Sequence, residues 1–106
     1  MSKADAGFTA LADPTRRAIL DLLRARRTCT AGEIAAHFAA LSRPAVSRHL
    51  RVLREAGLVR AEEVGREWRY HLDAGAIARL YHGWFERFAP LWEQSLTRLK
   101  RQVEET

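Results

Sequence analysis

The hydrophobic period of this chain switches at Gly57 from helical to strand-like, and this switch constrains the fold more than any other feature. Before Gly57, apolar residues recur at the spacing of amphipathic helices. After it, LVRAEEV and REWRYHL alternate apolar and polar residues on either side of Gly65-Arg66, which is typical of two strands joined by a tight turn. At Asp73, a suitable helix cap, the helical spacing returns. The pattern predicts a mainly α fold with one β-hairpin, in the order ααααββα.

The first two helices are expected between the start of the chain and about Arg26. Phe8 and Leu11 fall on a short first helix. Asp13 can cap the second helix, and Pro14 occupies its first turn, where a missing N–H removes no helical hydrogen bond. The segment RRTCT that follows reads as a polar break between helices.

The next two helices form a compact pair. Thr30 and Glu33 have the spacing of a capping box at the start of a short helix. The tight connection AALS then leads to Ser42, near the cap of a helix expected over about residues 43–56, and Gly57 ends it. A short helix, a tight turn and a second helix make up the helix-turn-helix pattern.

Length and charge limit the domain organisation and the partner. A chain of 106 residues predicts one domain over 1–106, with the hairpin at about 58–72 and a terminal helix at about 74–104. The net charge of +5 is carried almost entirely by arginine. Because guanidinium groups pair well with phosphates and base edges, this charge favours a polyanionic partner, with nucleic acid preferred over a membrane surface.

The helix at about 43–56 divides into two faces on a helical wheel. Val46, Leu50 and Leu53 form an apolar face, and His49 falls among them rather than with the arginines. His49 is therefore expected to be a packed or edge histidine. The opposite, basic face predicts DNA contacts from Arg43, Pro44, Ser47, Arg48, Arg51 and Arg54.

The second helix of a helix-turn-helix enters the major groove, and its N-terminal residues meet base edges. Arg43 and Ser47 occupy that position, while Pro44 offers an apolar contact to a thymine methyl group. Arginines further along the helix suit phosphates better. The hairpin adds Arg66 at its tip and an outward Arg69, so it can act as a basic wing on the neighbouring groove or backbone.

Three segments together resemble the ArsR/SmtB family of bacterial winged-helix transcriptional regulators: LADPTRRAILDLL, EIAAHFAALSRPAVSRHLRVLREAGLV and GREWRYHL. The resemblance covers nearly all the chain from about Phe8. It implies a winged helix-turn-helix fold and a homodimeric repressor, acting on an inverted-repeat operator of its own or a neighbouring operon. It also implies DNA contact through Arg43, Pro44, Ser47, Arg48 and Arg51, with Arg66 in the wing.

The terminal helix is expected to be the dimer interface. A helix of this length would span roughly 45 Å, more than a domain this size covers with its own core. Its apolar stripe therefore needs a second surface, and the same helix of a second chain is the simplest one. Pro90 should kink or split the helix. The expected interface residues are Phe8, Leu11, Ile77, Tyr81, Trp84, Phe88, Leu91, Trp92 and Leu99.

The sensor sites that the resemblance implies are not complete in this sequence. The family's thiolate sites need clustered cysteines, whereas Cys29 is the single cysteine and is expected to be exposed at a turn. The zinc sites need several ligands on the last helix, whereas His82 is followed by Glu86 but by no second histidine. No metal site and no cofactor are therefore expected.

Other classes of function are less well supported. The sequence has no Gly-rich phosphate loop, catalytic dyad or paired-carboxylate motif, so no enzyme is expected. The absence of a signal peptide or long apolar run, together with a single cysteine, favours the cytoplasm. Two alternatives remain: a dimeric module that regulates a protein partner, and a derepressor that responds to thiol chemistry or metal through Cys29.

Overall fold

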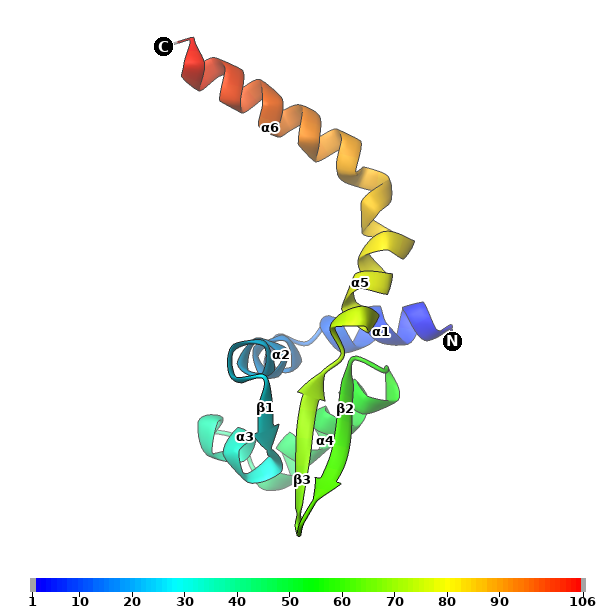
Figure 1. Ribbon diagram of the computed structural model, residues 1–106, viewed down its shortest axis with the longest axis vertical. Coiled ribbons are helices and arrows are strands. Elements are labelled where there is room, and N and C mark those ends of the chain that lie inside the picture. The colour runs from blue at the N-terminus through cyan, green and yellow to red at the C-terminus, as the bar shows by residue number, and fades with distance from the viewer. Residues whose placement is uncertain (1, 106) are drawn as a thin grey trace.

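A computed structural model describes residues 2–105 and shows a helical head with a small sheet, from which the last helix projects (Figure 1). The molecule measures 59 × 33 × 23 Å because this helix stands clear of the head. The elements, in chain order, are α1 (Lys3–Leu11), α2 (Pro14–Arg26), β1 (Thr28–Thr30), α3 (Ala31–His37), α4 (Arg43–Glu55), β2 (Val59–Val64), β3 (Glu67–Leu72), α5 (Ala74–Gly83), the 3₁₀ helix η1 (Phe85–Phe88) and α6 (Ala89–Glu104).

The predicted helix caps are confirmed. The Asp13 carboxylate accepts from the backbone N–H of Arg16 at 3.0 Å and begins α2. Thr30 and Glu33 form both hydrogen bonds of the capping box of α3, at 3.1 and 3.2 Å. Ser42 accepts from the first turn of α4. Each cap satisfies backbone donors that the start of a helix leaves unpaired.

The hairpin is confirmed, but it belongs to a sheet with a third strand. Val64 pairs with Glu67 across a two-residue turn whose Gly65 has a φ of +65°, a conformation that favours glycine. The sheet order is β1-β3-β2, with both pairs antiparallel. The interpretation of RRTCT as a polar break was therefore wrong, because Thr28–Thr30 forms β1 against β3.

The core lies between the helices of the head and the inner face of the sheet. Val46, Leu50 and Leu53 of α4 are all at most 3% exposed, which confirms the predicted apolar face of that helix. The largest fully buried side chains come from α2, β1, α3, α4 and the residue just before β2. They are Ile19, Leu23, Cys29, Ile34, Leu53 and Leu58.

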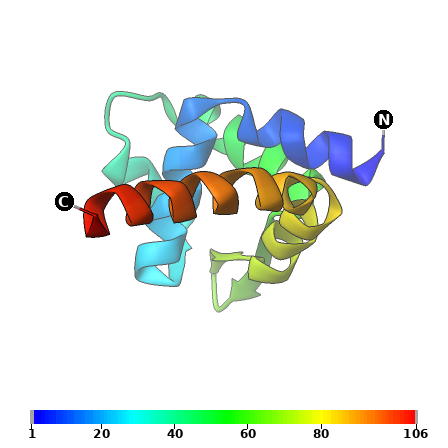
Figure 2. The same ribbon diagram turned by 90° about the horizontal axis from the view of Figure 1, so that it is seen from above.

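The terminal helix is split, as predicted, in the segment that precedes Pro90. The break falls at Trp84, whose φ of −141° and ψ of −55° are not helical, and η1 then leads into α6. Pro90 lies in the first turn of α6, where proline is well tolerated. Figure 2, a view from above, shows how far α6 extends beyond α5. Among residues 2–105, no helix is long and apolar enough to cross a membrane.

Candidate nucleic-acid interface

Helices α3 and α4 form the helix-turn-helix of the head. Helix α3 ends at His37, a short connection follows, and α4 begins at Arg43 after its Ser42 cap. The buried face of α4 packs on the core, so the opposite face is turned to solvent. Every residue of the predicted DNA-contacting set on α4 is exposed: Arg43, Pro44, Ser47, Arg48, Arg51 and Arg54.

A shallow groove accompanies the N-terminal half of α4. It has a volume of ≈ 120 Å³ and lies between α3, α4 and Tyr70 of β3. Arg43 and Ser47 line its edge, while Val46 and Leu50 form part of its floor. The N-terminal half of α4 is therefore accessible beside this groove.

The wing carries its two predicted basic residues in different settings. Arg66 occupies the exposed turn at the tip of the hairpin. Arg69 is partly buried, and its guanidinium lies 3.8 Å from the carboxylate of Glu67. Arg69 also contributes to the lowered pKa of Glu33, after the hydrogen bonds that this carboxylate makes with Thr30. Arg66 is thus free to approach a phosphate, whereas Arg69 already has carboxylates beside it.

An aromatic contact joins the wing to α4. The guanidinium carbon of Arg54 lies 5.9 Å from the ring centroid of Trp68 on β3. The alternation of REWRYHL places Trp68 on the same face of β3 as Tyr70 and Leu72, and this parity is the sequence signal that could have identified the contact. The sequence alone did not predict that Arg54 would be the residue in contact with that ring.

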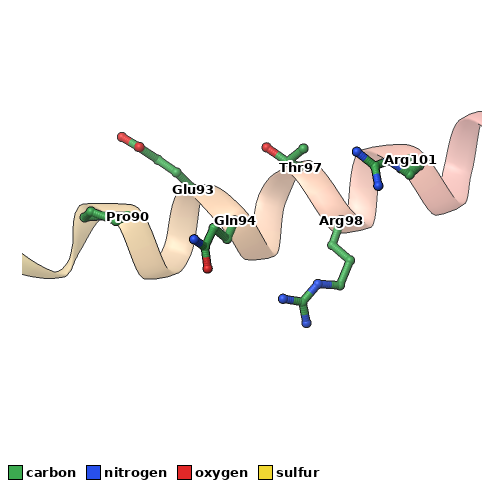
Figure 3. Close-up of a pocket in the computed structure, with 6 residues that line it drawn as sticks. All are labelled: Pro90, Glu93, Gln94, Thr97, Arg98 and Arg101. Atoms are coloured by element: carbon green, nitrogen blue, oxygen red, sulfur yellow. The ribbon is translucent and has the colours of Figure 1, made fainter.

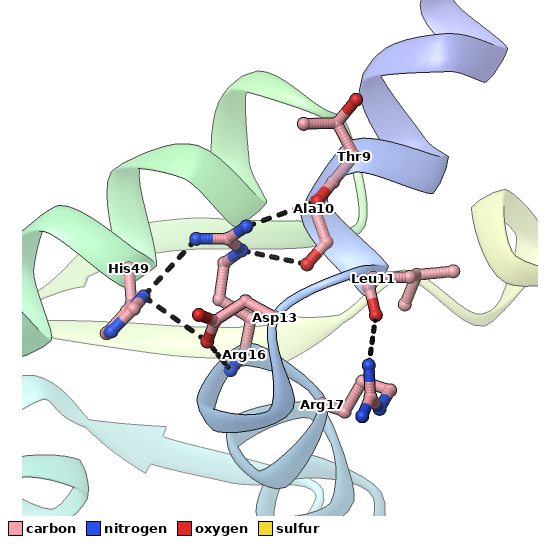
Figure 4. Close-up of polar contacts among 7 residues, drawn as sticks. All are labelled: Thr9, Ala10, Leu11, Asp13, Arg16, Arg17 and His49. Carbon is pink, nitrogen blue, oxygen red and sulfur yellow. Dashed lines mark hydrogen bonds and ion pairs between the residues drawn. The ribbon is translucent and has the colours of Figure 1, made fainter.

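His49 connects α4 to the junction between α1 and α2 (Figure 4). Its Nδ1 lies 3.5 Å from a guanidinium nitrogen of Arg16 and 4.0 Å from the carboxylate of Asp13. Its side chain is 19% exposed, which confirms the predicted packed or edge histidine.

Arginines also tie α1 to α2 at the same junction. The guanidinium of Arg16 donates to the carbonyls of Ala10 and Thr9 at 2.8 and 3.1 Å. Arg17 donates to the carbonyl of Leu11 at 2.7 Å (Figure 4). These carbonyls end α1, where positive charge is stabilising. The N–H of Arg16 also holds the pKa of Asp13 below its usual value.

The apolar stripe of the C-terminal elements is mostly uncovered. On α6, Leu91, Leu99 and Val103 are 63%, 58% and 66% exposed. The other face of α6 is polar, and Figure 3 shows side chains from that face. The residues drawn there line a shallow groove along the helix: Pro90, Glu93, Gln94, Thr97, Arg98 and Arg101.

Aromatic rings cluster where α1, α5 and η1 meet. Phe8 makes edge contacts with Trp84 and Phe85, each with ring centroids 5.8 Å apart. Trp84 also contacts Phe88 at 5.0 Å, yet it remains 45% exposed. Of the predicted interface residues, Leu11 and Ile77 instead pack partly against the core of the head.

Cys29 is not exposed, so the expectation of an accessible thiol was wrong. The side chain of Cys29 is 0% exposed in the core, because β1 directs it inward between α2 and the sheet. Burial raises the pKa of this thiol above its usual range. A buried, protonated thiol is a poor nucleophile and a poor metal ligand.

Two histidines on the surface each lie beside one carboxylate. His82 lies 3.0 Å from Glu86, and His71 lies 2.9 Å from Glu62. Within residues 2–105, no three side chains of histidine, cysteine, aspartate or glutamate come close enough to hold a metal ion.

The helix-turn-helix and its basic wing define a winged DNA-binding domain, and comparisons with known proteins agree. A sequence profile described as a helix-turn-helix domain matches residues 11–62. The transcriptional repressor SdpR of Bacillus subtilis is 44% identical over 70 residues, 66% of this chain and 76% of that protein. The HTH-type transcriptional regulator Rv2034 of Mycobacterium tuberculosis is 42% identical over 93 residues, 88% of this chain and 81% of that protein.

Solved structures share most of this architecture. The ArsR-like transcriptional regulator from Rhodococcus sp. RHA1 superposes with a TM-score of 0.71 at 32% identity, covering 93% of this chain and 91% of that chain. The chain belongs to the ArsR/SmtB family of transcriptional regulators. It is therefore a member of a family of regulators with a helix-turn-helix DNA-binding domain, and not of a family of enzymes.

Proposed function

We propose that this protein is a dimeric repressor that binds a specific double-stranded DNA operator with inverted-repeat symmetry. The observation that carries the proposal is the division of α4 into a buried face and an exposed face with four arginines and a serine. A helix supported in this way can enter the major groove without exposing the core. The operator would belong to its own operon or to a neighbouring one.

Different residues of the exposed face would contact different parts of the DNA. Arg43, Ser47 and Arg48 near the N-terminal half of α4 would meet base edges, where arginine pairs with guanine and serine accepts or donates. Arg51 further along would neutralise phosphates, and Arg66 would reach the backbone or minor groove from the wing. Pro44 would contact a thymine methyl group.

Dimerisation would cover the exposed apolar stripe of α5, η1 and α6. Large exposed apolar patches mark interaction sites, and aromatic residues dominate the energetics of such interfaces. The expected interface comprises Phe8, Leu11, Ile77, Tyr81, Trp84, Phe88, Leu91, Trp92 and Leu99. A two-fold dimer would place two copies of α4 roughly 34 Å apart, one turn of DNA, which requires half-sites of inverted-repeat symmetry.

Repression that does not depend on metal or thiol chemistry is the form of regulation we favour. SdpR is described as a transcriptional repressor, and the similarity to it supports the same sign of regulation here. The burial of Cys29 and its raised pKa argue against a thiol- or metal-responsive derepressor. A module that regulates a protein partner would not need the exposed arginine face of α4.

Selection of duplexes from a random library by the purified full chain tests the proposal. A palindromic sequence should be enriched, and its affinity should fall about 10³-fold or more between roughly 0.05 and 0.2 M salt. Arg48→Ala should weaken binding to the enriched duplex by about 5- to 100-fold, the range for a base-reading arginine. Arg98→Ala, which removes the same charge from the polar face of α6, is the matched control and should bind like the wild type.

Two outcomes would contradict the proposal. If the protein bound no duplex even at low salt, the protein-partner alternative would replace it. If Arg48→Ala lost its helical circular dichroism, Arg48 would be a structural residue rather than a DNA contact.

A further inference from the structure

The outer part of the wing has less support than the part near the head. Strand β1 pairs with β3 from Arg69 to His71, whereas β2 pairs with β3 along the whole of Glu67–Leu72. From Trp68 to the turn at Gly65-Arg66, the wing is therefore a two-stranded ribbon. Such a ribbon is marginally stable in water unless something packs against one of its faces.

Trp68 stands where the third strand ends, and Arg54 is packed on its ring. The parity of β3 places Trp68 on the same face as Tyr70 and Leu72, both of which pack against the core. Its ring is 47% exposed and lies 5.9 Å from the guanidinium carbon of Arg54. Within residues 2–105, that guanidinium makes no hydrogen bond or ion pair, so the aromatic ring is its contact.

We propose that Trp68 is a positioning residue for DNA binding, which holds the outer wing against the recognition helix α4 through Arg54. The inference rests on the proposed function and deepens it. It assigns Arg54 to the wing, whereas the sequence assigned this arginine to the DNA backbone. A cation over the face of a tryptophan is attracted by the negative potential of the ring.

The contact fixes where the wing tip lies relative to α4. Arg66 is two residues from Trp68 on the same ribbon, so any change in the angle of the ribbon moves Arg66 most. A wing that is already held at one angle loses less conformational entropy when Arg66 binds DNA. The arginines of α4 thus divide into Arg51, which is free for phosphate, and Arg54, which supports the wing.

Hydrogen exchange of the wing amides tests the contact in the free protein. Arg54→Ala and Trp68→Ala should each speed exchange within residues 63–68 by about two- to fivefold, the equilibrium equivalent of one partly exposed cation–π contact. Trp68→Phe keeps an aromatic face and should exchange nearly as the wild type does. Arg51→Ala is the matched control with the same charge change on α4, and it should leave the wing unchanged. Wild-type exchange rates in Arg54→Ala would overturn the proposal.

The salt dependence of DNA binding separates positioning from direct phosphate contact. On the duplex enriched from the random library, Arg51→Ala should reduce the slope of log affinity against log salt by about two, one for each subunit of the proposed dimer. Arg54→Ala and Trp68→Ala should each lower affinity about two- to fivefold for each subunit of the dimer, with the slope unchanged. The double variant should be no weaker than the weaker single variant. Trp68→Phe should restore most of the affinity.

Two results in that experiment would count against the proposal in different ways. A slope that falls in Arg54→Ala as much as in Arg51→Ala, with full affinity in Trp68→Ala, would make Arg54 a phosphate ligand and would overturn the positioning role alone. If the wild type enriched no duplex, the proposed function would fail and the positioning role with it. Hydrogen exchange would then still show whether Arg54 holds the wing.

Discussion

The head (α1 to α5 with the sheet) and the C-terminal arm (η1 and α6, residues 85–104) share an amphipathic helical pattern, but its apolar face is buried in the head and exposed in the arm. In the head, α2, α3 and α4 turn their apolar faces toward one another and toward the sheet, so Ile19, Ile34 and Leu53 are all 0% exposed. In the arm, α6 extends away from the helices of the head (Figure 1), and its Leu96 remains 62% exposed. The apolar side chains of the head are buried by its own elements, whereas most of those of the arm are exposed.

Helical periodicity in the sequence therefore identifies an apolar face, but it does not identify which surface covers that face. A stripe at helical spacing is covered within the chain only where short connections fold the next element back on it. Between α3 and α4 the connection is short and turns the chain. At Trp84 the break redirects the chain outward, and α6 carries its stripe away from the core.

The largest expected effect is a difference in the free energy of unfolding between substitutions in the head and in the arm. Leu53→Ala removes a fully buried side chain and should lower the free energy of unfolding by about 2–5 kcal/mol. Leu99→Ala deletes the same atoms from a half-exposed position and should change the unfolding of the dissociated chain far less. Urea unfolding at low protein concentration measures both variants. Equal destabilisation would mean that the arm packs on its own head in solution.

Dimerisation should be more sensitive to substitutions at the arm than to substitutions in the head. Trp84→Ala removes the ring at the centre of the aromatic cluster and should weaken the dimer by about 2 kcal/mol or more, which is roughly 30-fold in its dissociation constant. Sedimentation at several concentrations gives that constant. Thr97→Ala, on the polar face of α6 in Figure 3, is the control and should sediment like the wild type. An unchanged profile for Trp84→Ala would count against the interface.

A smaller effect should appear on the exposed face of the head. Ser47→Ala deletes one hydroxyl per subunit from the end of α4 proposed to read bases. It should cost about 0.5–1.5 kcal/mol of binding for each half-site of the selected duplex, or roughly 2- to 12-fold per half-site. Dimerisation and stability should not change, because Ser47 is exposed. Fluorescence anisotropy with labelled duplex measures the affinity. Full affinity in this variant would remove Ser47 from the contact surface.

The smallest effect concerns acid stability at the junction of α1 and α2. The pKa of Asp13 is lowered from 3.8, chiefly by the backbone N–H of Arg16, so its contribution to stability is complete above 3.8 and is lost as pH falls through the folded value. Asp13→Asn keeps a capping acceptor that does not titrate. Its stability deficit relative to the wild type should therefore shrink between about pH 6 and about pH 3, as measured by urea midpoints. A constant deficit would contradict the assignment.

Local signals predicted most of the head correctly. Asp13, Thr30 with Glu33, and Ser42 act within three residues along the chain, so their caps could be read directly from sequence spacing. The buried and exposed faces of α4 also follow from its own periodicity. The position of His49 at the edge of the core followed from the same helical wheel.

The errors came from contacts between distant parts of the chain. Strand β1 has three residues, too few to show a period, and it exists because Cys29 pairs with Tyr70. That pairing also buries the thiol, which the turn-like sequence RRTCT did not indicate. The contact between Arg54 and Trp68 joins two elements whose spacing depends on the whole head.

Footprinting of the selected duplex with hydroxyl radicals tests most directly whether the head and the arm act together. A dimer that joins two heads through their arms predicts two protected regions, centred about one helical turn or roughly 34 Å apart and related by two-fold symmetry. Trp84→Ala should weaken both regions together. A single protected half-site that is unchanged in Trp84→Ala would show that one head binds alone and would contradict the account.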